Sequence, residues 1–226
     1  MGGIKKEYQK LGSQSVTVLG SVVRAFSEVS CVEIIVIAVS ENEENSARAA
    51  LPPECLVSER PKLFFVNGGK TRRASVYNAL LFLSSHNPCY VLIHDGARPW
   101  VSPSLIQSII ASAQEHGAVI PLLSLTDTPK ECDAPFENKS DGAREQAFLE
   151  KPIFIKTHLK RACTGIAQTP QGFKFPEILR AHEKAALCDD EEFTDDAEVW
   201  GRFCGQVAVI AGSKENRKIT FPEDIT

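Results

Sequence analysis

Apolar and polar residues are arranged along this chain in segments that predict strands and helices in alternation. A helical repeat over residues 16–29 precedes an almost continuously apolar run at residues 32–39, which predicts a buried strand. Downstream, the pattern predicts strands at 62–66, 89–93, 118–123 and 206–211, and helices at 73–83, 105–115, 175–187 and 194–203. Continuously apolar strands that alternate with helices indicate an α/β fold, with a mostly parallel sheet and helices on both faces.

The alternation stops between residues 124 and 162. Residues 133–146 are polar, contain Pro135 and Gly142, and show no hydrophobic period. Such a segment predicts an exposed loop or flexible arm. We therefore interpret residues 1–226 as a single domain with an extended arm at about 126–162.

Composition narrows the class of protein. The chain has 226 residues and a formal net charge of −4, so no general basic patch suggests a nucleic-acid partner. Its seven cysteines are scattered without a Cys-x-x-Cys pair, which indicates reduced thiols and a cytoplasmic location. No apolar stretch approaches the length of a bilayer span, so we expect no membrane partner.

The run from Val91 to Pro99 is the most informative segment for chemistry. An apolar strand ends there in Asp95 and Arg98, and open α/β sheets bind ligands at the carboxyl ends of their strands. Asp95 could hold a divalent cation and Arg98 a phosphate. The alternative is a structural ion pair between the two. We expect His94 to be a hydrogen-bonded structural residue.

Other polar clusters also lie near the ends of predicted elements. They are residues 68–75 (GGKTRRAS), residues 126–130 (TDTPK), Arg161 with residues 168–171 (QTPQ), and residues 194–196 (TDD) with 216–220 (NRKIT). A turn into a capped helix, a solvated loop and a helix N-cap are the structural alternatives for the first, second and last clusters. Together the clusters supply cations, hydroxyls and a carboxylate suited to phosphoryl or nucleotidyl transfer. The histidines and cysteines show no spacing typical of a transition-metal site.

Six segments resemble, in order, the motifs of one enzyme family. They are Gly68-Gly69-x-x-Arg72-x-x-Ser75-Val76, residues 91–99, Asp127-Thr128-x-Lys130, Gln168-Thr169-Pro170-Gln171-x-Phe173, Thr194-Asp195-Asp196-Ala197 and Lys218-Ile219-Thr220-x-Pro222-Glu223-Asp224. Over nearly the whole chain they resemble the 2-C-methyl-D-erythritol 4-phosphate cytidylyltransferases of non-mevalonate isoprenoid biosynthesis. The resemblance implies a Rossmann-like nucleotidyltransferase sheet with a protruding dimerisation arm. It also implies transfer of the cytidylyl group of CTP to methylerythritol phosphate, release of pyrophosphate, and Mg²⁺ as cofactor.

The resemblance also implies roles for single residues. Asp95 matches the family's Mg²⁺ ligand, Lys6 matches a lysine that neutralises the triphosphate, and Lys218 would stabilise charge at the α-phosphate. The positions matching the nucleotide site are Gly68, Gly69, Ser75 and Gly96, and those matching the methylerythritol phosphate site are Arg98, Thr128, Lys130, Arg161 and Thr194. Arg161 lies in the arm, which in this family crosses to a second subunit, so a homodimer with shared sites is implied.

This chain departs from the family pattern at its start. Relatives have a first strand and a glycine-rich loop before the segment that Lys6 matches. We expect Met1 to be an internal methionine of a longer reading frame, or the chain to be shortened. A chain starting at Met1 is expected to bind CTP weakly and to show little turnover, because backbone donors and a cation would be missing. Two alternatives remain open: a CDP-ribitol-type cytidylyltransferase, and a non-catalytic relative that keeps the fold and arm but binds no CTP.

Overall fold

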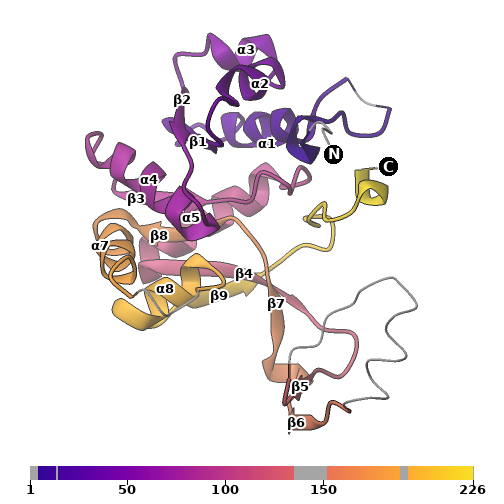
Figure 1. Cartoon of the computed structure of the whole chain (residues 1–226). Coiled ribbons are helices and arrows are strands. Elements are labelled where there is room, and N and C mark those ends of the chain that lie inside the picture. The colour runs from indigo at the N-terminus through magenta and orange to yellow at the C-terminus, as the bar shows by residue number, and fades with distance from the viewer. Residues whose placement is uncertain (1–4, 14, 135–151, 189–192, 226) are drawn as a thin grey trace. The chain divides into compact units, whose positions relative to one another are not determined.

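A computed structural model describes residues 5–13, 15–134, 152–188 and 193–225 (Figure 1). The chain divides into two compact units. The first unit comprises residues 1–121 and 168–226, and the second comprises residues 122–167. Most of the polar stretch at 133–146 lies outside the described residues, and the interpretation as one domain with an arm stays a prediction.

The predicted strands and helices are all present in the first unit, with ends shifted by at most two residues. In chain order the elements of this unit are η1 (Lys6–Tyr8), α1 (Val18–Ser27), β1 (Ile34–Val39), α2 (Glu44–Ala49), α3 (Pro53–Leu56), β2 (Lys62–Asn67), α4 (Arg72–Ser84), β3 (Tyr90–Ile93), α5 (Pro103–His116), the first part of β4 (Ala118–Ser124), β8 (Gln171–Lys174), α7 (Phe175–Ala185), α8 (Asp196–Phe203), β9 (Ala208–Ala211) and η3 (Pro222–Ile225).

Side-chain caps explain where the longer helices begin. The Thr17 hydroxyl accepts a hydrogen bond from the Gly20 amide at 2.9 Å and starts α1. Ser102 caps α5 in the same way. Each cap satisfies a backbone N–H that the first helical turn leaves without a partner.

Within the described residues the strands pair in both directions. Strands β1 and β2 pair in parallel, whereas β8 runs antiparallel to both β3 and β4. Strand β9 also pairs with β4. The sequence of β8 (Gln-Gly-Phe-Lys) did not predict a strand because it has no apolar run. It lies between two apolar strands, where a Cβ on Gly172 would stand only 2.7 Å from Ile109.

Helices cover both faces of this sheet, as the pattern predicted. Along β3, Tyr90 and Leu92 pack against the α1 and α5 core, whereas Val91 and Ile93 join the core of α4, α7 and α8. This alternation is the period of two that places successive strand residues on opposite faces. The carboxyl end of β3 is therefore held between two helical layers, which supports the segment carrying Asp95.

Strands β1 and β3 do not pair with each other within the described residues. Both nevertheless contribute to the same helix-covered core, through Ile35 and Leu92. Most of β1 is only half-buried, and Ala38 is exposed. Full coverage of this apolar strand, expected from its sequence, is thus not observed.

The second unit is a small set of strands. Its elements are the last part of β4, β5 (Lys130–Cys132), β6 (Ile155–His158), η2 (Arg161–Cys163) and β7 (Gly165–Ala167). The end of β4 pairs antiparallel with β7, and β5 pairs antiparallel with β6 across a register shift at Glu131/Cys132. All seven cysteines are free thiols. No helix in the described ranges is long and apolar enough to cross a bilayer.

Candidate functional site

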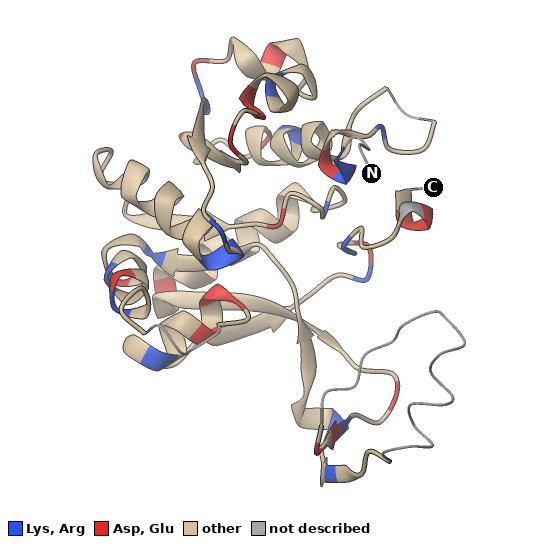
Figure 2. Cartoon of the chain, viewed as in Figure 1, with Lys and Arg blue, Asp and Glu red and all other residues tan. Residues whose placement is uncertain are grey.

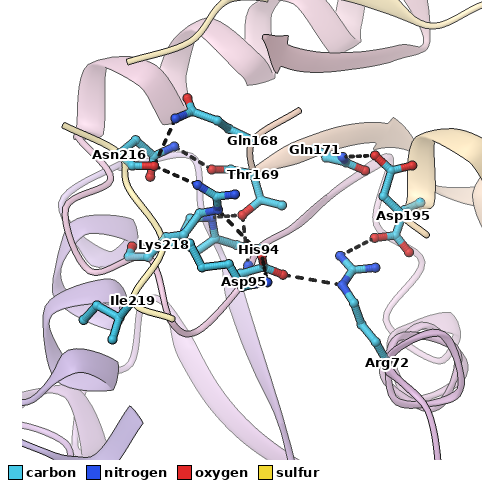
Figure 3. A network of polar contacts seen from close by, with 12 residues as sticks. Arg72, His94, Asp95, Gln168, Thr169, Gln171, Asp195, Asn216, Lys218 and Ile219 are labelled. Atoms are coloured by element: carbon cyan, nitrogen blue, oxygen red, sulfur yellow. Dashed lines mark hydrogen bonds and ion pairs between the residues drawn. The ribbon is translucent and has the colours of Figure 1, made fainter. Parts of the chain in front are cut away.

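Asp95, just beyond the end of β3, is surrounded by three cations, of which Arg72 and Lys218 are labelled in Figure 3. One carboxylate oxygen lies 3.0 Å from the Lys218 Nζ and 3.6 Å from the Arg98 Nε. The other lies 3.4 Å from the Arg72 Nε. Three segments far apart in sequence thus bring positive charge to one carboxylate.

These cations determine the ionisation of Asp95. Burial by itself would raise the pKa of this carboxyl, but Lys218, Arg72 and Arg98 outweigh it and hold the pKa below its ordinary value. Asp95 is therefore an anion at neutral pH. The site combines one fixed negative charge with an excess of positive charge, which suits a polyphosphate.

Arg98 has a structural role in addition to its place near Asp95. Its side chain is buried, and Nη1 donates to the Asn216 carbonyl at 2.8 Å. The ion pair between Asp95 and Arg98, considered from the sequence as the alternative to a ligand site, is present. Contact of Arg98 with a substrate stays a prediction.

The segment that carries Lys218 is anchored by buried amides. Asn216 is fully buried and donates to the Thr169 carbonyl at 2.8 Å, and Gln168 donates to the Asn216 carbonyl at 3.1 Å. Lys6 reaches the same segment, because its Nζ donates to the Ile219 carbonyl at 2.8 Å. The two lysines predicted to act on the triphosphate therefore meet at one segment.

Residues 68–75 form a turn that leads into α4. The Gly68 amide donates to the Val39 carbonyl at 2.7 Å, and the Ser75 hydroxyl accepts from the Gly69 amide at 3.0 Å. Thr71 caps α4 by accepting from the Ala74 amide. The structural alternative, a turn into a capped helix, is thus observed, and nucleotide contacts by these residues stay a prediction.

Alanine at Gly69 and alanine at Gly96 are expected to have opposite effects. A Cβ at Gly69 would lie 2.4 Å from the Ala74 Cβ, whereas a Cβ at Gly96 would meet nothing closer than 3.9 Å. We expect Gly69→Ala to destabilise the fold by about 1–3 kcal/mol through overpacking. Gly96→Ala should stabilise it by about 0.4–1 kcal/mol, because alanine restricts the unfolded chain. Urea unfolding of both variants measures this, and equal stabilities would contradict it.

His94 is a buried, hydrogen-bonded structural residue, as the sequence suggested. Its Nε2 lies 3.2 Å from the Arg98 carbonyl, which can only accept, so Nε2 carries the proton. Nδ1 then accepts from the Thr169 hydroxyl at 3.0 Å, and that oxygen accepts from the Asp95 amide at 3.0 Å. Burial lowers the pKa of His94 to about 4, so the ring is neutral at pH 7. The neutral ring fixes the backbone on both sides of Asp95.

The remaining predicted residues do not join the Asp95 cluster in the described contacts. Thr128, Lys130 and Arg161 lie in the second unit and are exposed. There the Lys130 Nζ lies 2.9 Å from His158, and Arg161 donates to the Thr126 carbonyl at 2.8 Å. Thr194 belongs to the first unit, where its amide and its hydroxyl both donate to Glu198 at 2.8 Å. Asp195 caps α8, as the structural alternative for this cluster anticipated.

Three residues of the site received no role from the sequence. Arg72 and Asp196 were noted only within motifs, and Asn216 only within a cluster. Their importance comes from burial and pairing: Asp196 is 1% exposed and Asn216 is 0% exposed. In the sequence, the only indication of a role for such a residue is that it is polar and lies next to a motif glycine or a helix cap. This indication does not show which distant residue the side chain contacts.

Only a metal site completed by the substrate fits the described residues. They contain no group of three or more histidine, cysteine or acidic side chains able to hold a metal ion. Mg²⁺ commonly binds through one or two carboxylates together with substrate phosphates and water. Asp95, ionised and 15% exposed, fits a site of that kind.

Comparison with known proteins gives a consistent result. A family model described as IspD, 2-C-methyl-D-erythritol 4-phosphate cytidylyltransferase, matches residues 1–226. A bifunctional enzyme IspD/IspF from Brucella anthropi is 34% identical over 220 residues, which cover 97% of this chain and 48% of that enzyme. The chain spans about half the length of the curated relatives it matches.

Solved structures match as well. 4-Diphosphocytidyl-2C-methyl-D-erythritol synthase from Anaerococcus prevotii gives a TM-score of 0.78 at 25% identity, covering 96% of this chain and 89% of that one. 2-C-Methyl-D-erythritol 4-phosphate cytidylyltransferase from Francisella tularensis gives 0.73 at 26% identity, covering 98% and 90%. The α/β fold inferred from the sequence is thereby confirmed as a nucleotidyltransferase fold.

Proposed function

The chain belongs to the 2-C-methyl-D-erythritol 4-phosphate cytidylyltransferase family, and we propose that it transfers the cytidylyl group of CTP to methylerythritol phosphate and releases pyrophosphate. The observation that carries this proposal is Asp95 with its three cations at the carboxyl end of β3. A site with one anion and several fixed cations suits a nucleoside triphosphate. The family match favours methylerythritol phosphate over ribitol phosphate as the acceptor, and an enzyme over a non-catalytic relative.

The reaction requires charge stabilisation more than bond activation. An oxygen of the acceptor phosphate forms a bond to the α-phosphorus of CTP, and the bond from that phosphorus to the bridging oxygen of pyrophosphate breaks with its electron pair. Negative charge develops on the leaving group, so fixed cations lower the barrier. Lys6 and Lys218 supply this charge, because both reach the segment next to Asp95.

Asp95 would hold Mg²⁺ together with the triphosphate oxygens. The bound ion would neutralise phosphate charge when CTP is present. The phosphates of CTP would offer Lys218, which now pairs with Asp95, a second anion to contact. His94 and Thr169 hold the Asp95 backbone in place. The turn at Gly68 and Gly69 would let the backbone approach the nucleoside closely, because glycine carries no side chain.

The acceptor is proposed to bind through residues of the second unit. Lys130 and Arg161 are cations with exposed side chains, and Thr128 adds a hydroxyl. We propose that these residues bind the phosphate of the acceptor, and that the enzyme is a homodimer that shares its sites. Arg98 and Thr194 of the first unit are each proposed separately as acceptor contacts. Basic residues are interspersed with acidic ones along the described part of the ribbon, so phosphate binding depends on such local groups (Figure 2).

A coupled assay of pyrophosphate release tests the proposed function. With CTP and Mg²⁺, pyrophosphate release is expected to be faster with methylerythritol phosphate as acceptor than with ribitol 5-phosphate. ATP, GTP and UTP in place of CTP serve as nucleotide controls. A folded protein that binds CTP in calorimetry but gives no pyrophosphate with either acceptor would contradict the proposed reaction.

A further inference from the structure

Arg72 lies between two carboxylates that come from different parts of the first unit. It is the first residue of α4 and directly follows Thr71, which caps this helix after the Gly68–Gly69 turn. Its Nε lies 3.4 Å from Asp95, and its Nη2 donates to Asp196 at 2.8 Å (Figure 3). The shorter contact is the one made outside the Asp95 cluster. Asp196 therefore contributes strongly to where the guanidinium lies.

Asp196 is buried, and its second oxygen lies close to a buried histidine nitrogen without a hydrogen bond between them. It is the first residue of α8 and is only 1% exposed. Its other carboxylate oxygen lies 3.2 Å from the Nε2 of His182, which is 0% exposed and stacks on Tyr77 of α4. A buried carboxylate is stable only when it is paired. The position at a helix N-terminus adds a favourable dipole interaction.

The start of α8 is itself fixed by a buried glutamine. Gln171 of β8 is 1% exposed, donates to Asp195 at 2.8 Å and accepts from the Ala197 amide at 3.1 Å. These two bonds hold the backbone on both sides of Asp196. The carboxylate is thus a rigid anchor, whereas the Arg72 side chain is 38% exposed and would otherwise be mobile.

We infer that Asp196 is a positioning residue for nucleotidyl transfer, which acts by holding the Arg72 guanidinium beside Asp95. This rests on the proposed function. Within the described residues, Nη1 of Arg72 has no hydrogen-bond partner, so a donor remains for a nucleotide held in the site. Arg72 makes one contact to each of two carboxylates, and two such contacts orient a guanidinium better than one contact does. Asp196 thus acts on the substrate only through Arg72.

A double-mutant cycle tests this inference. CTP KM and kcat are measured from pyrophosphate release for the wild-type chain, Asp196→Asn, Arg72→Gln and the double variant. Asn keeps the shape of the side chain and removes its charge. We expect Asp196→Asn alone to raise the CTP KM about tenfold, the size of effect typical of a coupled contact pair. In the Arg72→Gln background the same change should have no further effect on KM.

A merely structural role for Asp196 predicts a different result. Its effect on KM would then be the same in both Arg72 backgrounds, and this additivity would overturn the inference. Glu183→Gln, which removes an exposed carboxylate from α7 beside His182, is the matched control and should leave KM unchanged. If Asp196→Asn does not fold, His182→Phe replaces it in the cycle, because it removes the contact to the other carboxylate oxygen.

The failure of the proposed function gives a separate signature. A wild-type chain without pyrophosphate release and without CTP binding in calorimetry contradicts the function itself, and the inference falls with it. A wild-type chain that is active, with additive KM effects of the two substitutions, overturns the inference alone. Thermal unfolding of all four proteins identifies any variant whose loss of activity comes from loss of fold.

Discussion

Replacing Asp95 with asparagine is expected to lower kcat for pyrophosphate release by about a hundredfold to a thousandfold, the cost of removing one charged group from a reacting centre. Asp95 is the carboxylate that Lys218, Arg72 and Arg98 share, and it is the proposed partner of Mg²⁺. A neutral amide would hold the cation weakly. Steady-state kinetics at saturating CTP, over a range of Mg²⁺ concentrations, measures the effect.

Two controls make the Asp95 result specific. Glu44→Gln removes an exposed carboxylate that pairs with Arg48 within one helix, and activity should stay at the wild-type level. Thermal unfolding of Asp95→Asn separates loss of chemistry from loss of fold, since three cations lose their anion. Wild-type kcat in a folded Asp95→Asn protein would rule out the proposed role of this carboxylate.

Acidification from pH 7 to pH 4 is expected to cost the fold about 3 kcal/mol through His94 alone. The folded pKa of about 4 lies below the ordinary value of 6.5 because the ring is buried. Between these two values the unfolded chain binds a proton that folded His94 does not bind. Stability due to His94 is therefore constant above pH 6.5 and falls progressively as the pH drops towards 4. Urea unfolding at several pH values between 7.5 and 4 gives the curve.

The effect of Asp95 appears in a different pH window. Its pKa is lowered in the folded state, so its contribution to stability is lost only below the ordinary pKa of an aspartate, as the pH falls towards the folded value.

The His94→Gln variant keeps a neutral polar side chain and should flatten the curve of stability against pH between pH 6.5 and 4. His116→Gln, which changes an exposed histidine, should leave the curve unaltered. An unchanged slope in His94→Gln would show that the acid sensitivity arises elsewhere.

Local sequence predicted the elements because their causes are local. The apolar run at 32–39 and the repeat over 16–29 correspond to β1 and α1, and Ser102 starts α5. Asp95 was recognised because an abrupt change from apolar to charged residues marks a strand end, whatever packs around it. The same holds for the turn at Gly68 and Gly69, where glycine is needed because neighbouring atoms leave no room for a Cβ.

The direction of β8 could not be read in this way. Its four residues carry no apolar alternation, and pairing with β3 and β4 depends on segments that are distant along the chain. A parallel sheet follows from strand–helix alternation only when each strand returns through a helix. Here β8 enters the sheet after the second unit and without a preceding helix, so it runs antiparallel.

The sequence by itself determined the α/β class, the positions of the longer helices to within two residues at each end, and the strand-end carboxylate at Asp95. Each of these depends on hydrophobic period, capping chemistry or a boundary between neighbouring residues. Only the tertiary structure decided that Lys218, Arg72 and Arg98 surround Asp95, that Asn216 anchors the Lys218 segment, and that Asp196 binds Arg72. The physical reason is that burial and ion pairing between distant segments are properties of the folded chain. The sequence around a charged residue does not show whether its side chain is solvated by water or paired with a buried carboxylate.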